Sequence, residues 1–216
     1  MKLVIGNKNY SSWSLRPWLL LEHFAIPFEE VRIALYTPES RPLLKTHSPS
    51  GKVPALIDGT VAIWDSLAIC EYVAELEAAR TAWPEDRAAR AIARSVAAEM
   101  HSGFATLREL MPMNVRARGR RVDRTAALGD DIARVQELWT SCRERAGSDG
   151  PWLFGRFSIA DAMFAPVACR FRTYDVACAG TAAAYLATLL AHPALQRWSA
   201  AAERETEVVE SSEVGR

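Results

Sequence analysis

Three serines lie close together near the start of the chain, at Ser11, Ser12 and Ser14, with Tyr10 just before them. They fall between a strand-like apolar run and a segment whose apolar residues recur at helical spacing. A hydroxyl at a helix N-terminus can donate to an anion, and the helix dipole favours negative charge there. Serines in such clusters also cap helices and shape turns. The cluster therefore predicts an anion-binding hydroxyl at this point, with an ordinary cap as the alternative.

A second group of candidate residues lies between Gly51 and Val73. Here Asp58-Gly59 separates two short apolar runs, which is the strongest short-range signal for a β-hairpin. Pro54 precedes the first run, where a proline is tolerated because it has no N–H to donate to a sheet. If the Val53–Pro54 bond is cis, the Val53 N–H and C=O can pair with an extended peptide. A trans bond, the commoner state, gives an ordinary strand start.

Asp65 and Ser66 follow the hairpin and precede apolar residues at helical spacing. Both residue types are favoured helix N-caps. The N–H groups of the same helix start can also hold a carboxylate, and the Asp65 side chain can pair with an ammonium group. This region therefore predicts a site for the free amino-acid end of a short peptide, with a simple cap as the alternative.

The elements that position these residues form a βαβ unit followed by a ββα unit. Strands are expected at residues 2–5, 28–33, 55–57 and 61–64. A helix follows the first strand, and another follows the last. Lys45 and His47 are expected in the loop that leads to Lys52.

Trp83-Pro84 marks a break in this pattern, and only helical patterns follow it. The first is one long helix, ended by Pro112, whose apolar face is formed by Ile92, Val96, Met100, Phe104, Leu107 and Met111. Further helices are expected at 126–142 and 158–171. Ser158 and Asp161 match a capping box, which we interpret as structural. The residues after Glu203 are expected to be frayed.

Length and composition exclude several classes of protein. The 216 residues can form one large or two modest domains. Lys plus Arg and Asp plus Glu number 26 each, and this zero net charge argues against binding to nucleic acid. No apolar run approaches the ~20 residues of a membrane span, so we expect a cytoplasmic protein without a membrane partner. The four cysteines lack metal-ligand spacing and are expected to be buried free thiols, with no metal site.

The order of these features resembles the cytosolic glutathione transferases of the bacterial, serine type. The SSWSLR stretch is similar to the serine motif of the zeta and tau classes, and Val-Pro, the hairpin, Asp-Ser and the Ser-x-x-Asp box follow it in the family's order. The resemblance covers roughly residues 1–200. It implies an α/β N-terminal thioredoxin-like domain (βαβ-ββα) at 1–78, followed by an all-α C-terminal domain at 87–205.

The resemblance also implies a role for each candidate residue. Ser11 stabilises the glutathione thiolate, with Ser12 and then Tyr10 as alternatives, while Ser14 caps the helix and Arg16 forms a structural salt bridge. Glutathione is held by Lys52, Val53, Pro54, Asp65 and Ser66. The pocket for the second substrate is lined by Tyr10, Trp13, Met100, Phe104 and Met113.

The implied activity is conjugation of the glutathione thiolate to small electrophilic, hydrophobic substrates, a detoxification reaction. Glutathione is then a co-substrate, and the protein is expected to be a homodimer. Two alternatives stay open: a zeta-type cis-trans isomerase acting on a cis-enedione acid, and a glutathione-binding or regulatory module without catalysis. Trp13 stands where the zeta class has a cysteine, which counts against the isomerase.

Overall fold

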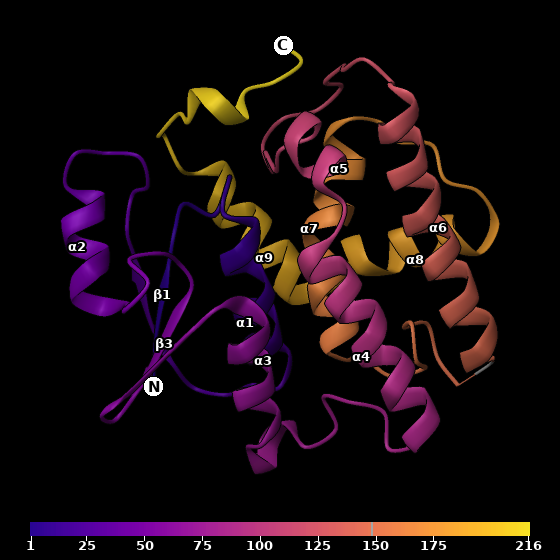
Figure 1. The fold of residues 1–216 in the computed structure, drawn as a ribbon, viewed down its shortest axis with the longest axis horizontal. Coiled ribbons are helices and arrows are strands. Elements are labelled where there is room, and N and C mark those ends of the chain that lie inside the picture. The colour runs from indigo at the N-terminus through magenta and orange to yellow at the C-terminus, as the bar shows by residue number, and fades with distance from the viewer. Residues whose placement is uncertain (148) are drawn as a thin grey trace.

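The computed structural model describes residues 1–147 and 149–216. A sheet with its helices lies on one side of the molecule, and a group of helices lies on the other (Figure 1). β1 (Lys2–Ile5) runs parallel to β2 (Glu29–Arg32) and antiparallel to β3 (Ala55–Asp58), which pairs antiparallel with β4 (Val61–Trp64). The strand order is therefore β2-β1-β3-β4, and each predicted strand is confirmed.

The β3–β4 hairpin forms at the Asp-Gly pair, as predicted. Gly59 has φ +56°, the left-handed conformation that such a tight turn needs and that glycine adopts without steric cost. The chain then passes directly into a helix after Trp64. The hairpin therefore brings the Val53–Pro54 segment and the Asp65–Ser66 segment to neighbouring positions.

Two helices of the N-terminal part were expected, and a third was not. α1 (Ser12–His23) and α3 (Ser66–Ala74) pack against each other and follow the predicted positions. α2 (Ser40–His47) carries Lys45 and His47, so the prediction that these two residues lie in a loop was wrong. Pro42 falls in the first turn of α2, where a helix tolerates proline, and buried Leu44 fixes α2 against β1, β2 and β3 residues.

Helices make up the regular structure after the sheet. A single 3-10 turn at Glu77–Ala79 leads into them. They are α4 (Arg87–Ser102), α5 (Ala105–Leu110), α6 (Ala126–Ala146), α7 (Ile159–Thr173), α8 (Gly180–Leu190) and α9 (Pro193–Glu203). The chain is thus an α/β thioredoxin-like domain followed by a helical one, as the sequence predicts, while the exact domain bounds of 1–78 and 87–205 stay a prediction.

The long helix predicted before Pro112 is in fact two helices. α4 ends at Ser102, and Phe104 adopts φ 60° in the left-handed region before α5 begins. The apolar spacing continues across this break, because both helices bury the same face. The periodicity therefore identified the buried residues correctly and missed the interruption.

α7 lies at the centre of the helical group, in contact with α1, α4 and α8. Its predicted capping box is present. The buried Asp161 carboxylate accepts hydrogen bonds from the Ser158 N–H (2.8 Å), the Leu153 N–H (3.1 Å) and the Tyr185 hydroxyl (2.9 Å). Burial raises the pKa of Asp161 to about 6, and these hydrogen bonds oppose the shift. The box is structural, since it fixes the start of the helix that joins the two halves.

The residues after α9 are packed rather than frayed, which corrects the prediction. This segment, residues 205–216, includes a 3-10 turn at Glu210–Ser212 and the buried Val209. In Figure 1 it is the yellow strip that runs across the top of the view, near the start of α1 and the residues after α5. Its Glu and Ser composition suggested solvation, but arginines elsewhere in the chain bind its carboxylates and carbonyls.

Residues 1–147 and 149–216 contain no helix that is both long enough and apolar enough to cross a membrane. In the same residues no group of three or more His, Cys, Asp or Glu side chains is arranged to hold a metal ion. All four cysteines are free thiols, and Cys70, Cys142 and Cys169 are buried. Burial raises the pKa of the Cys142 thiol to about 11, so that thiol stays protonated.

Candidate functional site

The serine cluster forms the start of α1, with Ser11 as the N-cap and Ser12 as the first helical residue. Ser14 lies inside the first turn and so does not cap the helix as predicted. The Ser14 Oγ accepts a hydrogen bond from the Gly6 N–H (3.1 Å) and lies 2.7 Å from the Ser11 Oγ. Because the Gly6 N–H can only donate, the Ser14 hydroxyl can donate to Ser11. The Ser11 proton is then free for a ligand.

A cavity of about 550 Å³, which we call the serine cavity, lies beside these hydroxyls. Its walls come from the start of α1, from α2, from the loop before Pro54, and from the helical half of the chain. Among its lining residues are Tyr10, Ser11, Ser12, Trp13, Lys52, Val53, Arg108, Met113, Arg170 and Ser212. Both predicted thiolate-stabilising serines therefore reach a space large enough for a small substrate.

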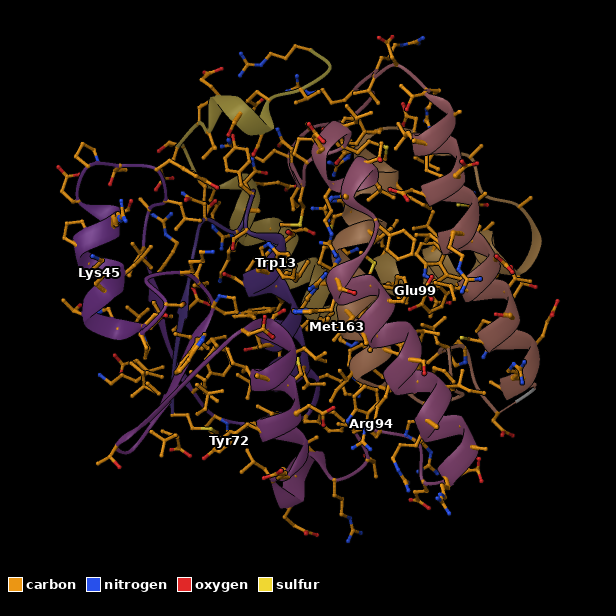
Figure 2. All side chains as sticks on the ribbon, in the orientation of Figure 1. Trp13, Lys45, Tyr72, Arg94, Glu99 and Met163 are labelled. Carbon is orange, nitrogen blue, oxygen red and sulfur yellow. The ribbon has the colours of Figure 1, made fainter. Side chains whose placement is uncertain are left out.

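A second cavity of about 420 Å³, which we call the cap cavity, adjoins the first. It is lined by Pro54, Trp64, Asp65 and Ser66 from the hairpin and the start of α3. The two cavities share Trp13, Lys52 and Val53. Figure 2 shows Trp13 at the middle of the molecule, between the sheet side and the helical side. All five residues predicted to hold a peptide thus line one continuous region.

The Val53–Pro54 peptide bond is cis, the less common of the two states considered from the sequence. Within the described residues, the Val53 N–H donates no hydrogen bond. An unpaired backbone N–H beside a cavity can bind an extended peptide as an added strand would. The geometry at Val53 is therefore the one that the peptide-binding interpretation required.

Asp65 caps α3 and also contacts the helical half of the chain. Its Oδ1 accepts from the Leu67 N–H (2.9 Å) and the Ala68 N–H (3.2 Å), and its Oδ2 lies 3.2 Å from the His101 Nε2. Its own φ of 75° lies in the left-handed region, which a non-glycine residue adopts only where its surroundings enforce it. Both sequence interpretations of Asp65 are compatible with this geometry, because Asp65 caps α3 and also lines the cap cavity.

His101 is held by Asp65 on one side and by Arg16 on the other. The Arg16 Nη1 lies 3.5 Å from the His101 Nδ1 and 3.3 Å from the Ser66 Oγ. Burial lowers the pKa of His101, and the charges of Arg16 and Arg108 add to this effect while Asp65 opposes it. The imidazole is therefore neutral at pH 7, and its Nε2–H donates to Asp65.

Arg16 is fully buried and has no carboxylate partner among the described residues, so the predicted salt bridge is absent. Its guanidinium stacks on Trp13 at 4.4 Å, and its Nε and Nη2 make no hydrogen bond within the part of the chain that is described. Burial and the nearby charges of Arg108 and Arg170 lower the pKa of Arg16 well below its usual range. An uncompensated buried cation is costly, so a role beyond stability is indicated.

Arg108 and Arg170 line the serine cavity and were not identified from the sequence. The Arg170 Nε donates to the Met111 carbonyl (2.8 Å), and the Arg108 Nε donates to the Gly103 carbonyl (3.0 Å). The Nη1 of Arg108 and the Nη1 of Arg170 are both buried and make no hydrogen bond to a described residue. Burial and the charge of Arg108 lower the pKa of Arg170 to about 10, which still leaves it positive at pH 7.

Arg108 and Arg170 line the serine cavity, and the guanidiniums of Arg16 and Arg108 stack on Trp13 at 4.4 and 4.8 Å. A signal for Arg170 was available in the sequence, because it is a charged residue in a mostly apolar helix. Arg108 gave no such signal, since an arginine in a short amphipathic helix is ordinary. Only packing shows that the three residues lie close together.

Two of the five residues predicted for the second-substrate pocket lie elsewhere. Met100 is fully buried in the core and Phe104 nearly so, and neither lines the serine cavity. Tyr10, Trp13 and Met113 do line it. Met100 and Phe104 belong to the apolar face predicted for one long helix before Pro112. In the structure, α4 packs this face against α7 instead of a cavity.

The Tyr10 hydroxyl is engaged by other side chains. It donates to the Glu213 Oε1 (2.7 Å) and accepts from the Arg116 Nη2 (3.0 Å). A hydroxyl with both its donor and acceptor functions used has little left for a thiolate. This geometry favours Ser11 or Ser12 over Tyr10.

A larger cavity, about 730 Å³, lies between the start of α4, the end of α6 and the residues before α7. Trp83, Glu85 and Arg145 are among its lining residues. Neither Ser11 nor Ser12 lines this cavity, and none of the predicted peptide-holding residues does. The candidate site is therefore the smaller pair of adjoining cavities, where the chemically useful residues converge.

Comparisons with known proteins show which proteins this chain is similar to. The family model for the glutathione S-transferase N-terminal domain matches residues 10–76. A probable maleylacetoacetate isomerase of Caenorhabditis elegans is 35% identical over 100 residues, 46% of this chain and 45% of that protein. A dichloromethane dehalogenase of Methylorubrum extorquens is 40% identical over 52 residues, 23% of this chain and 18% of that protein. The chain thus matches less than half the length of these curated relatives.

Solved structures share the fold over nearly the whole chain. A maleyl pyruvate isomerase, described as a bacterial zeta-class transferase, has a TM-score of 0.72 and 22% identity over 96% of this chain and all of that one. A maleylacetoacetate isomerase from Methylobacterium extorquens, with malonate and glutathione bound, has a TM-score of 0.70 and 21% identity over 97% of this chain and all of that one. A glutathione transferase homologue from Burkholderia, with glutathione bound, has a TM-score of 0.68 and 23% identity over 94% and 98%. Residues 10–76 therefore match the glutathione S-transferase N-terminal domain, and the whole chain shares the two-part fold of these solved structures.

Proposed function

We propose that this protein is a glutathione-dependent transferase. The observation that carries the proposal is the junction of the two cavities at Trp13, Lys52 and Val53. An extended tripeptide can reach from Asp65 and Ser66 to the serines across this junction. Its γ-glutamyl carboxylate meets the α3 N-terminus, its ammonium meets Asp65, and its glycine end lies toward Lys52. The cysteine backbone pairs with Val53 beside Pro54.

The proposed chemistry is activation of the glutathione thiol by Ser11. A free thiol has a pKa near 8.5 and is mostly protonated at pH 7. The Ser11 hydroxyl, oriented by Ser14, donates to the sulfur and favours the thiolate, and the α1 N-terminus adds to this effect. The thiol proton leaves to solvent, and the sulfur forms a bond to an electrophilic carbon. Ser12 stays the alternative donor.

Ultraviolet titration of bound glutathione tests this proposal. Thiolate absorbance as a function of pH gives the pKa of the bound thiol for the wild type, Ser11→Ala and Ser12→Ala. We expect a lowered thiol pKa in the wild type and a rise in Ser11→Ala. A rise in Ser12→Ala alone would transfer the role to Ser12. If the wild-type protein does not bind glutathione, the proposal fails, and so does the glutathione-binding module without catalysis.

A second candidate function is supported by the arginines of the serine cavity. Arg108 and Arg170 line a space beside the proposed thiolate, and a carboxylate is the natural partner of a guanidinium. An electrophile that carries a carboxylate would therefore fit better than a purely hydrophobic one. Three of the proteins named above are isomerases with acidic substrates in their names, which agrees with this candidate.

The isomerase and the conjugating enzyme differ in their glutathione balance. In an isomerase the thiolate adds to the double bond and leaves again, so glutathione is regenerated. In conjugation each turnover consumes one glutathione. Measuring free thiol during turnover of a cis-enedione acid separates the two reactions. Trp13 in place of the zeta cysteine counts against the isomerase only if that cysteine is needed for the addition step.

We also propose a homodimer in the cytoplasm, in keeping with the family. Val61 and Trp64 on the edge strand β4 expose 51% and 47% of their surface. Large exposed apolar side chains on an edge strand favour association. Sedimentation of the wild type and of Trp64→Lys tests the oligomeric state, with a monomer expected only for the variant. Cell fractionation tests the location.

A further inference from the structure

We infer that Glu213 decides which second substrates the serine cavity accepts, by holding Tyr10 and the segment 205–216 together as one wall of that cavity. Glu213 is thus a specificity-determining positioning residue and does not itself touch the reacting atoms. The inference rests on the proposed transferase function, because the second substrate is defined by it.

Segment 205–216 forms part of the serine cavity. Ser212 lines it together with Tyr10 and Met113. Glu213 is the next residue, and its side chain is only 8% exposed. The yellow segment in Figure 1 approaches the start of α1 from above, which agrees with this contact.

The Glu213 carboxylate makes several of the hydrogen bonds that hold this wall together. The Glu213 Oε1 accepts from the Tyr10 hydroxyl (2.7 Å) and from the Asn114 Nδ2 (2.9 Å). Its Oε2 accepts from the Arg120 Nη2 (2.5 Å) and from the Arg216 Nε (3.2 Å). Hydrogen bonds to charged groups are the stronger kind, so the wall depends on this residue more than on any other in its turn.

Arginines that follow α5 hold the same wall from outside the cavity. Arg116 donates to the carbonyls of Glu205 and Glu207 (2.8 Å to the latter) and to the Tyr10 hydroxyl. The Arg121 N–H donates to the Gly215 carbonyl (3.2 Å). Arg116 and Arg121 belong to a basic cluster of five arginines between residues 116 and 124. In the structure, part of it is committed to the segment that Glu213 completes.

A consequence follows for ligands of different size. An alkyl group on the glutathione sulfur projects into the serine cavity, where the Tyr10 ring and Ser212 shield it from water. If Glu213 is replaced, the wall loosens and a long alkyl chain keeps more contact with water, while a methyl group is little affected. The free energy of binding of an alkyl chain scales with the area removed from water.

The experiment compares S-hexylglutathione with S-methylglutathione by calorimetry, which needs no knowledge of the natural electrophile. In Glu213→Ala we expect the preference for the hexyl compound to fall about tenfold, the equivalent of roughly two methylene groups no longer buried. Glu210→Ala is the matched control, because Glu210 lies in the same segment and its side chain is 79% exposed, with a long salt bridge of 3.7 Å to Arg216. It should leave the preference unchanged.

A double-mutant cycle with Tyr10→Phe tests whether Glu213 acts through Tyr10. Residues that act through one contact have non-additive effects. We therefore expect Tyr10→Phe/Glu213→Ala to lower the preference no further than the larger single change. Additive effects would overturn the positioning role. An unchanged hexyl-to-methyl preference in folded Glu213→Ala would overturn the inference while glutathione binding, and with it the proposed function, still stands. A wild type that binds neither compound overturns both.

Discussion

Arg170 offers the sharpest test of the charge in the serine cavity, because its replacement by methionine should change stability and selectivity in opposite directions. Methionine fills much of the same space and removes the charge. Burial and the charge of Arg108 lower the pKa of Arg170 from its usual range to about 10, so the folded state disfavours its charged form at pH 7. At 1.36 kcal/mol per pKa unit this is a penalty of about 3 kcal/mol.

The variant also loses the hydrogen bond from the Arg170 Nε to the Met111 carbonyl. That bond contributes about 1–2 kcal/mol, and a carbonyl left unpaired offsets part of the gain. The net expectation is a protein more stable than the wild type by about 1–2 kcal/mol, measured by urea unfolding without ligand. A variant that is merely damaged would instead be less stable.

For selectivity, a hydrogen bond between the Arg170 guanidinium and a substrate carboxylate is worth about 1.5–3 kcal/mol. Its loss should lower kcat/KM for a carboxylate-bearing electrophile by roughly 10- to 150-fold. The methyl ester of the same electrophile lacks the charge and should be affected far less. The assay is therefore the ratio of kcat/KM for the acid to that for the ester, in the wild type and in Arg170→Met.

A ratio that stays the same in Arg170→Met and in Arg108→Met would refute the reasoning that these groups bind a carboxylate. Lys2→Met is a suitable control, because Lys2 is an exposed cation on β1 that pairs only with Glu29. It keeps the change in net charge and should leave the ratio unaltered. Malonate gives an independent readout, since it should raise Tm in the wild type more than in either arginine variant.

Three further predictions concern other parts of the molecule. Ser14→Ala removes the hydroxyl that orients Ser11, and we expect the pKa of bound glutathione to rise by about one unit, the equivalent of one hydrogen bond; no rise would show that Ser11 needs no such support. Burial, His23 and Arg197 lower the pKa of His192 to about 4, so its contribution to stability is complete above pH 6.5 and is lost as the pH falls toward 4. His192→Asn keeps a good N-cap for α9 without titrating, and unfolding curves should show a shallower loss of stability over that range than in the wild type or in His47→Asn. Asp161→Ala leaves the Leu153 N–H, the Ser158 N–H and the Tyr185 hydroxyl without their acceptor, and we expect a loss of about 3–5 kcal/mol by chemical denaturation, with little change in stability counting against the box.

Local signals predicted the elements that depend on local geometry. The Asp58-Gly59 turn, the Asp65 cap and the Ser158–Asp161 box each need a few residues at fixed spacing, and each is present. The same signals were ambiguous where two local states differ little in energy. The cis state of Val53–Pro54 is one example, whereas the break at Phe104 was not predicted at all.

The family's order of motifs carried the sequence interpretation from elements to a site. Ser11, Ser12, Lys52, Val53, Asp65 and Ser66 were identified by position and do converge on adjoining cavities. Met100 was misassigned because a helical stripe has the same spacing whether it faces a core or a cavity. Burial by α7 separates the two cases, and a sequence pattern contains no information about that partner.

By itself the sequence determined the strands, most helices, the caps and the order of the peptide-holding residues, because each depends on contacts between near neighbours in the chain. Tertiary structure alone decided that Arg16, Arg108 and Arg170 lie close together, that Arg16 and Arg108 stack on Trp13, and that Glu213 reaches Tyr10. These contacts join residues from α1, α5, α7 and segment 205–216, far apart in the chain. Charge and hydrogen bonding act through space, so the character of the second-substrate site emerges only when those segments are packed together.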